Sequence, residues 1–218
     1  MELVKKKRVY HFINREYGIS AIRDRKLKIS TLPGLNDPFE LLAHNVQDRN
    51  IRKFLNMAKK QFSDEFGIIC FSRDCTSPVQ WAHYADRNKG LCLGFDVSVD
   101  LLRSVFYVDQ RFDKFNFPDE GSEEEWAGRV LGTKFSQWSY EQEVRIFAEL
   151  KDQHNGLYFK GFDDFIVLKE VQVGFDCSIT RSELSELLRD YPEVKSFKVR
   201  PAFSSFEMIE NKDAGLWK

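Results

Sequence analysis

Three charged residues in the stretch WSYEQEVRIF, residues 138–147, have the types and the spacing that proton-transfer chemistry needs. Glu141, Glu143 and Arg145 fall at every second position. Alternate residues of a β-strand share one face, so the pattern predicts two carboxylates and a guanidinium side by side. Neighbouring like charges raise the pKa of one partner, which suits a general acid or base. The face is either a catalytic carboxylate pair or a salt-bridge ladder on a solvated strand.

Three other segments combine polar side chains with apolar or turn-forming ones. His11 lies in the strand-like segment 8–13, where its ring either donates to a ligand hydroxyl or is hydrogen-bonded within the core. Asn36 lies in LNDPFE, which forms either an Asx-type turn or a loop that closes over a ligand. His83 and Tyr84 lie in WAHYAD, a short helical segment that either joins the core or stacks on a planar base or nicotinamide.

The hydrophobic periodicity predicts one α+β domain over residues 1–218, built on a twisted, mostly antiparallel sheet with short flanking helices. The motifs occupy a core of residues 8–150, and residues 151–218 add strands and a helix that complete or cap the sheet. Strands are expected at residues 8–13, 27–31, 66–72, 90–96, 138–147, 165–168, 170–175 and 195–200. Helices are expected at residues 16–26, 48–66, 77–84 and 180–191, with a helix start at 122–125.

Composition limits the class of protein. Hydrophobic residues make up 42% of the 218 residues, enough for a sizeable core. The net charge of −1 argues against a general nucleic-acid coat protein but leaves room for a local basic patch. No apolar run approaches the roughly 20 residues of a membrane span, and no apolar segment follows the basic start at residues 1–8, so we expect no signal peptide. The four cysteines form no C-x-x-C pair, so we expect a cytoplasmic protein with free thiols and no membrane contact.

Several common catalytic motifs are absent. The chain has neither G-x-G-x-x-G nor the P-loop pattern, so it lacks the phosphate-binding loops of those types. It has no H-x-x-x-H or H-E-x-x-H and no cysteine pair, so we expect no metal site. It has no G-x-S-x-G nucleophile elbow, which argues against a serine hydrolase.

Several sequence blocks resemble two families. The order YHF, LNDPFE, CFS, W-HYA…G-CLGF and W-YE-E-R over residues 8–150 resembles the bacterial family called domain of unknown function 2971, which implies no activity. More remotely, the chain is similar to the ADP-ribosyltransferase superfamily. That superfamily has an Arg or His on its first strand, then a Ser or Tyr element, and a later strand with E-x-E. His11 or Arg8, then Ser72 and Tyr84, then the E-x-E at 141–143 stand in that order.

The second resemblance implies a split, mostly antiparallel sheet around a cleft for NAD, the substrate. Glu143 would stabilise the cation that forms when the nicotinamide–ribose bond breaks, and Glu141 would orient or deprotonate the acceptor. His11 would hold the adenosine-side ribose, Tyr84 would stack on nicotinamide, and Ser72 would support the strand or Glu143. Arg145 would bind a phosphate or pair with Glu143. The complete expected NAD-binding set is His11, Asn36, Ser72, His83, Tyr84 and Arg145.

The function implied is an NAD-dependent ADP-ribosyltransferase that modifies a nucleic acid or a protein. A bacterial toxin or antiphage effector would fit this activity. An antitoxin or a regulator is then a possible partner. One alternative is a non-catalytic module that senses a nucleotide or binds a protein. Another is a metal-independent nuclease that uses His11, His83 and Glu143.

Overall fold

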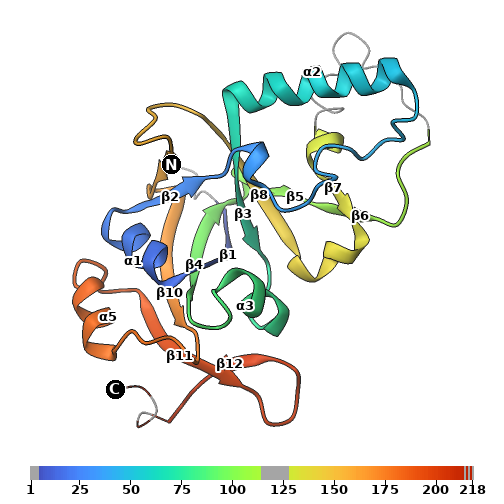
Figure 1. Ribbon diagram of the computed structural model, residues 1–218. Helices are drawn as coiled ribbons and strands as arrows, with labels where there is room; N and C mark the ends of the chain where they lie inside the picture. Colours follow the sequence, from blue (N-terminus) through green and yellow to red (C-terminus); the bar gives the residue numbers. More distant parts are fainter. Residues whose placement is uncertain (1–4, 114–127, 214, 216, 218) are drawn as a thin grey trace.

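The computed structural model describes residues 5–113, 128–213, 215 and 217 (Figure 1). Its strands are β1 (Lys6–Ile13), β2 (Lys26–Ile29), β3 (Phe66–Ser72), β4 (Leu91–Ser98), β5 (Arg103–Ser104), β6 (Phe106–Val108), β7 (Thr133–Phe135), β8 (Glu143–Glu149), β9 (Tyr158–Gly161), β10 (Ile166–Val173), β11 (Lys195–Pro201) and β12 (Met208–Glu210). Its helices are α1 (Arg15–Arg23), α2 (Arg49–Glu65), α3 (Pro78–Tyr84) and α5 (Arg181–Leu187), with the short 3-10 helices η1 (Leu32–Gly34), η2 (Val99–Leu101) and η3 (Ser136–Glu141). The helix start predicted at 122–125 lies outside the described residues.

The helices begin where side chains satisfy their free N–H groups. Asn14 Oδ1 accepts from the Tyr17 N–H at the start of α1, and Asp48 caps α2 in the same way. Thr180 and Glu183 form a reciprocal capping box at α5. None of the helices in the described part of the chain is long and apolar enough to cross a membrane.

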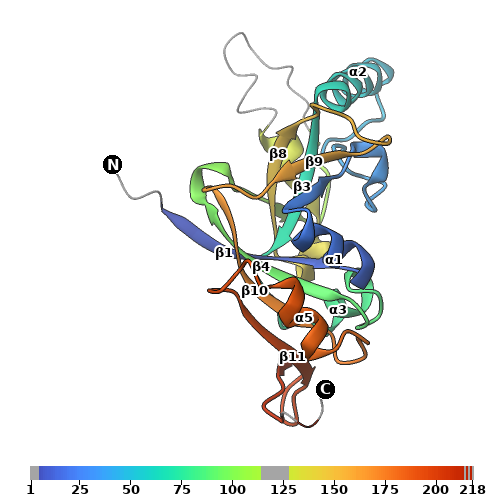
Figure 2. The same cartoon turned by 90° about the vertical axis from the view of Figure 1, so that its left-hand side faces the viewer.

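The predicted α+β class with a mostly antiparallel sheet is confirmed. Within the described residues, eight strands form one curled sheet in the order β12-β11-β10-β4-β1-β3-β8-β5, and only β10 and β11 pair in parallel there. The C-terminal strands β10, β11 and β12 extend the sheet beyond β4. Consequently α2 lies at one end of the molecule and the β11–β12 hairpin at the other (Figure 1 and Figure 2).

The two faces of the sheet pack against different helices. Leu91, Leu93 and Phe95 of β4 join the main core with α1 and α5, which lie side by side (Figure 2). Cys92, which points to the opposite face of β4, packs with Trp81 of α3. This arrangement fixes α3 on one face of the sheet, close to β1.

The centre of the sheet is loosely joined. β1 pairs with β4 along its whole length, from Lys6 to Ile13, but it meets β3 at a single pair, Tyr10 with Ser72. Beyond that pair the hydrogen bond to the β3 backbone comes from a side chain, because Nδ1 of His11 lies 2.9 Å from the carbonyl oxygen of Cys70. The two halves of the sheet therefore part between β1 and β3.

The strand predicted over residues 138–147 is wrong in its first half. Residues Ser136–Glu141 form η3, Gln142 has a left-handed backbone (φ 45°, ψ 46°), and β8 begins only at Glu143. Outside the sheet, the carbonyl oxygen of Gln142 accepts from the Arg73 N–H at 3.0 Å, and that of Tyr140 accepts from the Gln80 side chain at 3.0 Å. The segment before β8 thus satisfies its backbone with partners that only the folded chain supplies.

Gly174, directly after β10, lies against the backbone of the loop that follows α3. A Cβ atom on Gly174 would lie 2.1 Å from the carbonyl oxygen of Asn88 and 2.9 Å from that of Gly90. Because both contacts are with backbone, Gly174→Ala should lower the free energy of unfolding by about 1–3 kcal/mol in urea titrations. Gly128→Ala is the control, since nothing lies within 4 Å of its Cβ position. Equal unfolding midpoints for the two variants would contradict the close approach.

Candidate functional site

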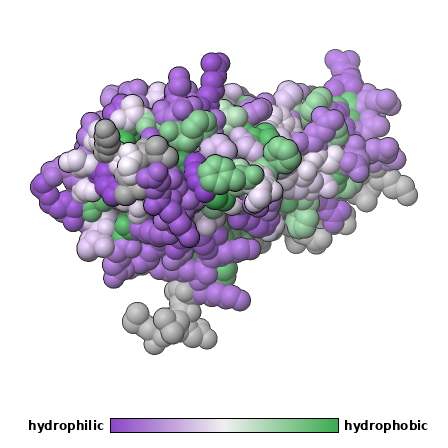
Figure 3. All heavy atoms as spheres, turned by 90° about the horizontal axis from the view of Figure 1, so that it is seen from below, coloured by the Kyte–Doolittle hydropathy of each residue, from purple (hydrophilic) through white to green (hydrophobic). Residues whose placement is uncertain are grey.

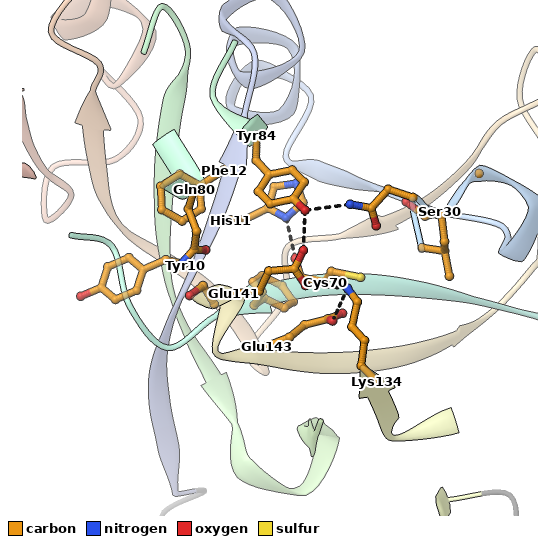
Figure 4. Close-up of a pocket in the computed structure, with 15 residues that line it drawn as sticks. Tyr10, His11, Phe12, Ser30, Cys70, Gln80, Tyr84, Lys134, Glu141 and Glu143 are labelled. Carbon is orange, nitrogen blue, oxygen red and sulfur yellow. Dashed lines mark hydrogen bonds and ion pairs between the residues drawn. The ribbon is translucent and has the colours of Figure 1, made fainter. Parts of the chain in front are cut away.

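A pocket of about 270 Å³ lies where β1 and β3 part (Figure 4). β1 and β3 form two of its sides, α3 and the loop after β2 close it, and η3 and β8 supply its carboxylates. Six of the eight predicted site residues line this pocket: His11, Asn36, Ser72, Tyr84, Glu141 and Glu143. Residues that are far apart in the sequence therefore meet in one cavity.

The other two predicted site residues lie elsewhere. His83 is exposed and does not line the pocket. Arg145 is 1% exposed, behind the pocket. Its five N–H groups donate to the carboxylates of Glu40 and Glu143 and to the carbonyl oxygen of Leu131. Of its two predicted roles, the structure favours pairing with Glu143, because no donor is left over for a phosphate.

A buried network of charges forms one wall of the pocket. Lys134 Nζ lies 2.5 Å from Glu141 Oε2 and 3.2 Å from Glu143 Oε2. Arg145 Nε lies 2.7 Å from Glu143 Oε1, and its Nη1 lies 2.5 Å from Glu40 Oε1. Glu141 and Glu143 are only 7% and 3% exposed, so the predicted alternative of a solvated strand face is wrong, although its ion pair between Glu143 and Arg145 is present.

The network has an excess of negative charge. Counted in their charged forms, the three carboxylates of Glu40, Glu141 and Glu143 face the two cations of Lys134 and Arg145, which leaves one negative charge. An uncompensated charge that is shielded from water acts strongly on whatever enters the cavity beside it. The wall can therefore either take up a proton or attract a positive charge.

The two pocket carboxyls have pKa values shifted in opposite directions. Burial raises the pKa of Glu141, and this effect exceeds the opposing ones of Lys134 and Tyr84. Burial also acts to raise the pKa of Glu143, but Arg145 and Lys134 outweigh it and lower that pKa overall. Glu143 is thus a fixed anion, and Glu141 is the carboxyl that binds a proton more readily. Opposite shifts of this kind separate the acid–base group from the electrostatic group of a site.

A chain of hydrogen bonds connects Glu141 to the mouth of the pocket. Asn36 Nδ2 donates to Tyr84 Oη at 2.7 Å, and Tyr84 Oη donates to Glu141 Oε1 (Figure 4). Burial, together with Glu141, raises the pKa of Tyr84, so its hydroxyl keeps the proton that it donates. The ring of Tyr84 is left to form pocket surface.

His11 presents an acceptor to the cavity. Burial lowers its pKa, so the imidazole is neutral near pH 7. A carbonyl oxygen only accepts, so Nδ1 must donate to Cys70, and Nε2 is then unprotonated. Nε2 has no hydrogen bond to any described residue and is available to a ligand hydroxyl. Ser72 is less available, because its Oγ accepts from the Asp74 N–H at 3.0 Å.

Sequence patterns did not identify Lys134, Cys70 or Gln80, which also line the pocket. Lys134 lies on the three-residue strand β7, and no periodic signal marks it as buried. Burial raises the pKa of Cys70 well above its ordinary value, so Cys70 stays a thiol. Gln80 follows Pro78 on α3, and its carboxamide holds η3 in place.

Comparison with known proteins gives one match. The profile of a family described as "Protein of unknown function (DUF2971)" matches residues 80–146, which run from α3 to the start of β8. This supports the resemblance to that family over part of the expected range, 8–150. The matched segment includes Tyr84, Glu141 and Glu143. No curated protein and no solved structure matches the chain.

Replacing Lys134 tests the network. Burial lowers the pKa of Lys134, but Glu143 and Glu141 raise it by more, so a charged ammonium holds the two carboxylates together. Lys134→Met should lower the free energy of unfolding by about 3–5 kcal/mol, because two buried carboxylates lose a partner. Lys195→Met is the matched control: it breaks the exposed ion pair with Glu210 and should cost less than about 1 kcal/mol. Similar losses in urea titrations would contradict the network.

The two pocket carboxyls should give stability opposite pH dependences. The folded-state pKa of Glu143 is below its ordinary value of 4.5, so its stabilisation is present above pH 4.5 and is lost as the pH falls through the folded-state pKa. The folded-state pKa of Glu141 is above 4.5. Its stabilising contribution is therefore present below pH 4.5 and is lost as the pH rises through the folded-state pKa.

Urea unfolding from about pH 3 to pH 8 measures both effects. The stability difference between wild type and Glu143→Gln should shrink on acidification. The difference between wild type and Glu141→Gln should shrink as the pH rises. Parallel stability curves for the three proteins would show that the two carboxyls are not shifted apart.

Proposed function

We propose that this protein is an NAD-dependent ADP-ribosyltransferase whose site is the pocket between β1 and β3. The observation that carries the proposal is the wall of the pocket, where a fixed anion, Glu143, stands beside a proton-binding carboxyl, Glu141. Cleavage of the nicotinamide–ribose bond needs both groups. It builds positive charge on the sugar and leaves a proton to be removed from the acceptor.

The reaction assigns each group a role. The bond between nicotinamide nitrogen and ribose C1′ breaks, and its electron pair leaves with nicotinamide. Glu143 stabilises the positive charge on the ribose. A lone pair of the acceptor then forms the new bond to C1′, and the acceptor's proton passes to Glu141. Nε2 of His11 accepts from a ribose hydroxyl, and the Tyr84 ring packs on nicotinamide.

The size of the pocket limits which part of NAD it holds. A cavity of about 270 Å³ is slightly smaller than the roughly 300–1,000 Å³ of pockets for drug-sized ligands. We infer that it takes one nucleoside portion of NAD, with the rest extending past Asn36 at the mouth. The adenosine-side ribose assigned to His11 from the resemblance and the nicotinamide assigned to Tyr84 compete for this space. Because Glu143 must face the nicotinamide-side ribose, we assign that ribose to His11 instead.

The acceptor and the biological setting are part of the proposal. The near-zero net charge leaves a nucleic acid and a protein both open as acceptors. Modification of either in the cytoplasm would suit a bacterial toxin or antiphage effector. A cell that carries such a protein would need an antitoxin or regulator to restrain it.

A second candidate is a module that binds a nucleotide without turnover. One observation favours it: each carboxylate oxygen of Glu141 and Glu143 already accepts from a side chain of the protein. Such a network is complete without a substrate. The nuclease alternative loses its basis, because His83 is exposed and outside the pocket that contains His11 and Glu143.

The test is incubation of the purified protein with labelled NAD and DNA, RNA or cell lysate. Wild type should transfer label to one class of acceptor. Glu143→Gln and Glu141→Gln should each reduce transfer by about 100-fold or more, since each removes a group that acts in the transition state. Glu149→Gln is the matched control, an exposed glutamate on the same strand β8, and should transfer label like wild type.

Two other results separate the candidates. Thermal stabilisation by NAD without release of nicotinamide would support the non-catalytic module and reject the transferase. Absence of both stabilisation and turnover would reject both functions for this pocket.

A further inference from the structure

The turn between β11 and β12 exposes two aromatic rings. Phe203 and Phe206 are 91% and 98% exposed, more than any other large apolar residue of the described chain. The turn is nonetheless well formed: the Ala202 N–H donates to the Glu207 carbonyl oxygen at 2.8 Å, and Ser205 Oγ donates to the Glu207 carboxylate at 2.7 Å. The hairpin therefore holds both rings out in water.

The two rings also line one side of a groove. Its volume is about 570 Å³, and it runs between the hairpin on one side and Pro78, Asn88 and Phe175 on the other. The hairpin points to the face seen from below, where apolar side chains are set among hydrophilic ones (Figure 3). The same face thus carries projecting apolar rings and a groove that could receive such rings.

We propose that this face is the interface of a symmetric dimer, in which the hairpin of each copy lies in the groove of the other. A two-fold axis brings the same patch of both copies together, so such a patch must be complementary to itself. A face that carries both the projecting rings and the groove meets this condition. The inference does not depend on the proposed function.

The area available matches what a stable dimer needs. A Phe side chain buries about 150–250 Å². Burial of both rings of both copies, with an equal area of groove wall, removes roughly 1,200–2,000 Å² from water, which is the range of standard specific interfaces. The rings of both copies, together with the groove walls that they cover, therefore supply enough surface for a stable dimer.

The local charges argue against two other occupants. The turn, residues 202–207, carries Glu207 and no cation, and the guanidinium of Arg200 at its base lies 4.0 Å from the centre of the Phe203 ring and donates to the Pro201 carbonyl oxygen. Nucleic-acid backbones and anionic lipid headgroups are attracted by basic surfaces, so this turn suits neither. A flat bilayer would also leave the groove unfilled, whereas an apolar side chain of a second copy fills it.

The interface would also support the pocket through α3. Met208, at the start of β12, donates its N–H to the Thr76 carbonyl oxygen at 2.8 Å and packs with Trp81 of α3. α3 carries Gln80 and Tyr84 into the pocket. Pairing of two copies would thus fix the hairpin that holds the outer side of this helix.

The test is the solution mass of the full chain by light scattering and sedimentation equilibrium. We expect wild type to have twice the 25.6 kDa mass of one chain. The double variant Phe203→Ser/Phe206→Ser should be monomeric, with a Kd weakened at least about 100-fold. Its circular dichroism should match wild type, because both rings are exposed. Phe106→Ser, which changes a 67% exposed ring outside the groove, is the control and should remain dimeric.

Three outcomes would overturn the proposal. The first is a wild type that is monomeric up to about 100 µM. The second is a double variant that dimerises as tightly as wild type. The third is a monomeric wild type that co-floats with phosphatidylserine vesicles through Phe203 and Phe206, which would assign the hairpin to a membrane surface.

Discussion

The ammonium of Lys134, held between Glu141 and Glu143, is the interaction on which the candidate site depends. It joins three segments, β7, η3 and β8, and Arg145 connects them to the loop that carries Glu40. A buried charge without a partner is expensive, so each of these segments is held in place by the needs of the others. The cations of the network lower the pKa of Glu143, while burial raises that of Glu141, and the network leaves one negative charge beside the pocket. The network thus fixes the positions of both carboxyls and keeps Glu143 ionised.

The pocket itself exists because the sheet is incompletely paired at its centre. β1 and β3 share one residue pair, and the imidazole of His11 supplies the next hydrogen bond to β3. A side chain in place of a backbone ladder keeps the carbonyl of Cys70 satisfied while the strands part. The resulting space is lined by His11, with its acceptor nitrogen, and by Glu141. The proposed reading of this cavity as an NAD site uses that opening, and the proposed dimer would stabilise α3, which forms another side of it.

Much of the fold could be predicted from local patterns. Apolar runs located β1, β3, β4 and β10, and the helices predicted at residues 16–26 and 180–191 correspond to α1 and α5. Short strands such as β5, β7 and β9 were not predicted, because their pairings are tertiary and leave no periodic signal. Six predicted site residues lie in one pocket, although Glu141 reaches it from η3 and not from a strand. Lys134 could not be predicted, because nothing in the sequence around a lone lysine shows that it is buried between two carboxylates.

Direct titration of the two pocket carboxyls is the measurement that most closely tests this account. Carbon-13 NMR of the protein with labelled glutamate side chains, assigned with the Glu141→Gln and Glu143→Gln variants, follows each group separately. We predict that Glu143 titrates below its ordinary pKa of 4.5 and that Glu141 titrates above it. If both groups titrate together near 4.5, the buried network does not separate a fixed anion from a proton-binding carboxyl, and the proposed division of labour in the pocket is contradicted.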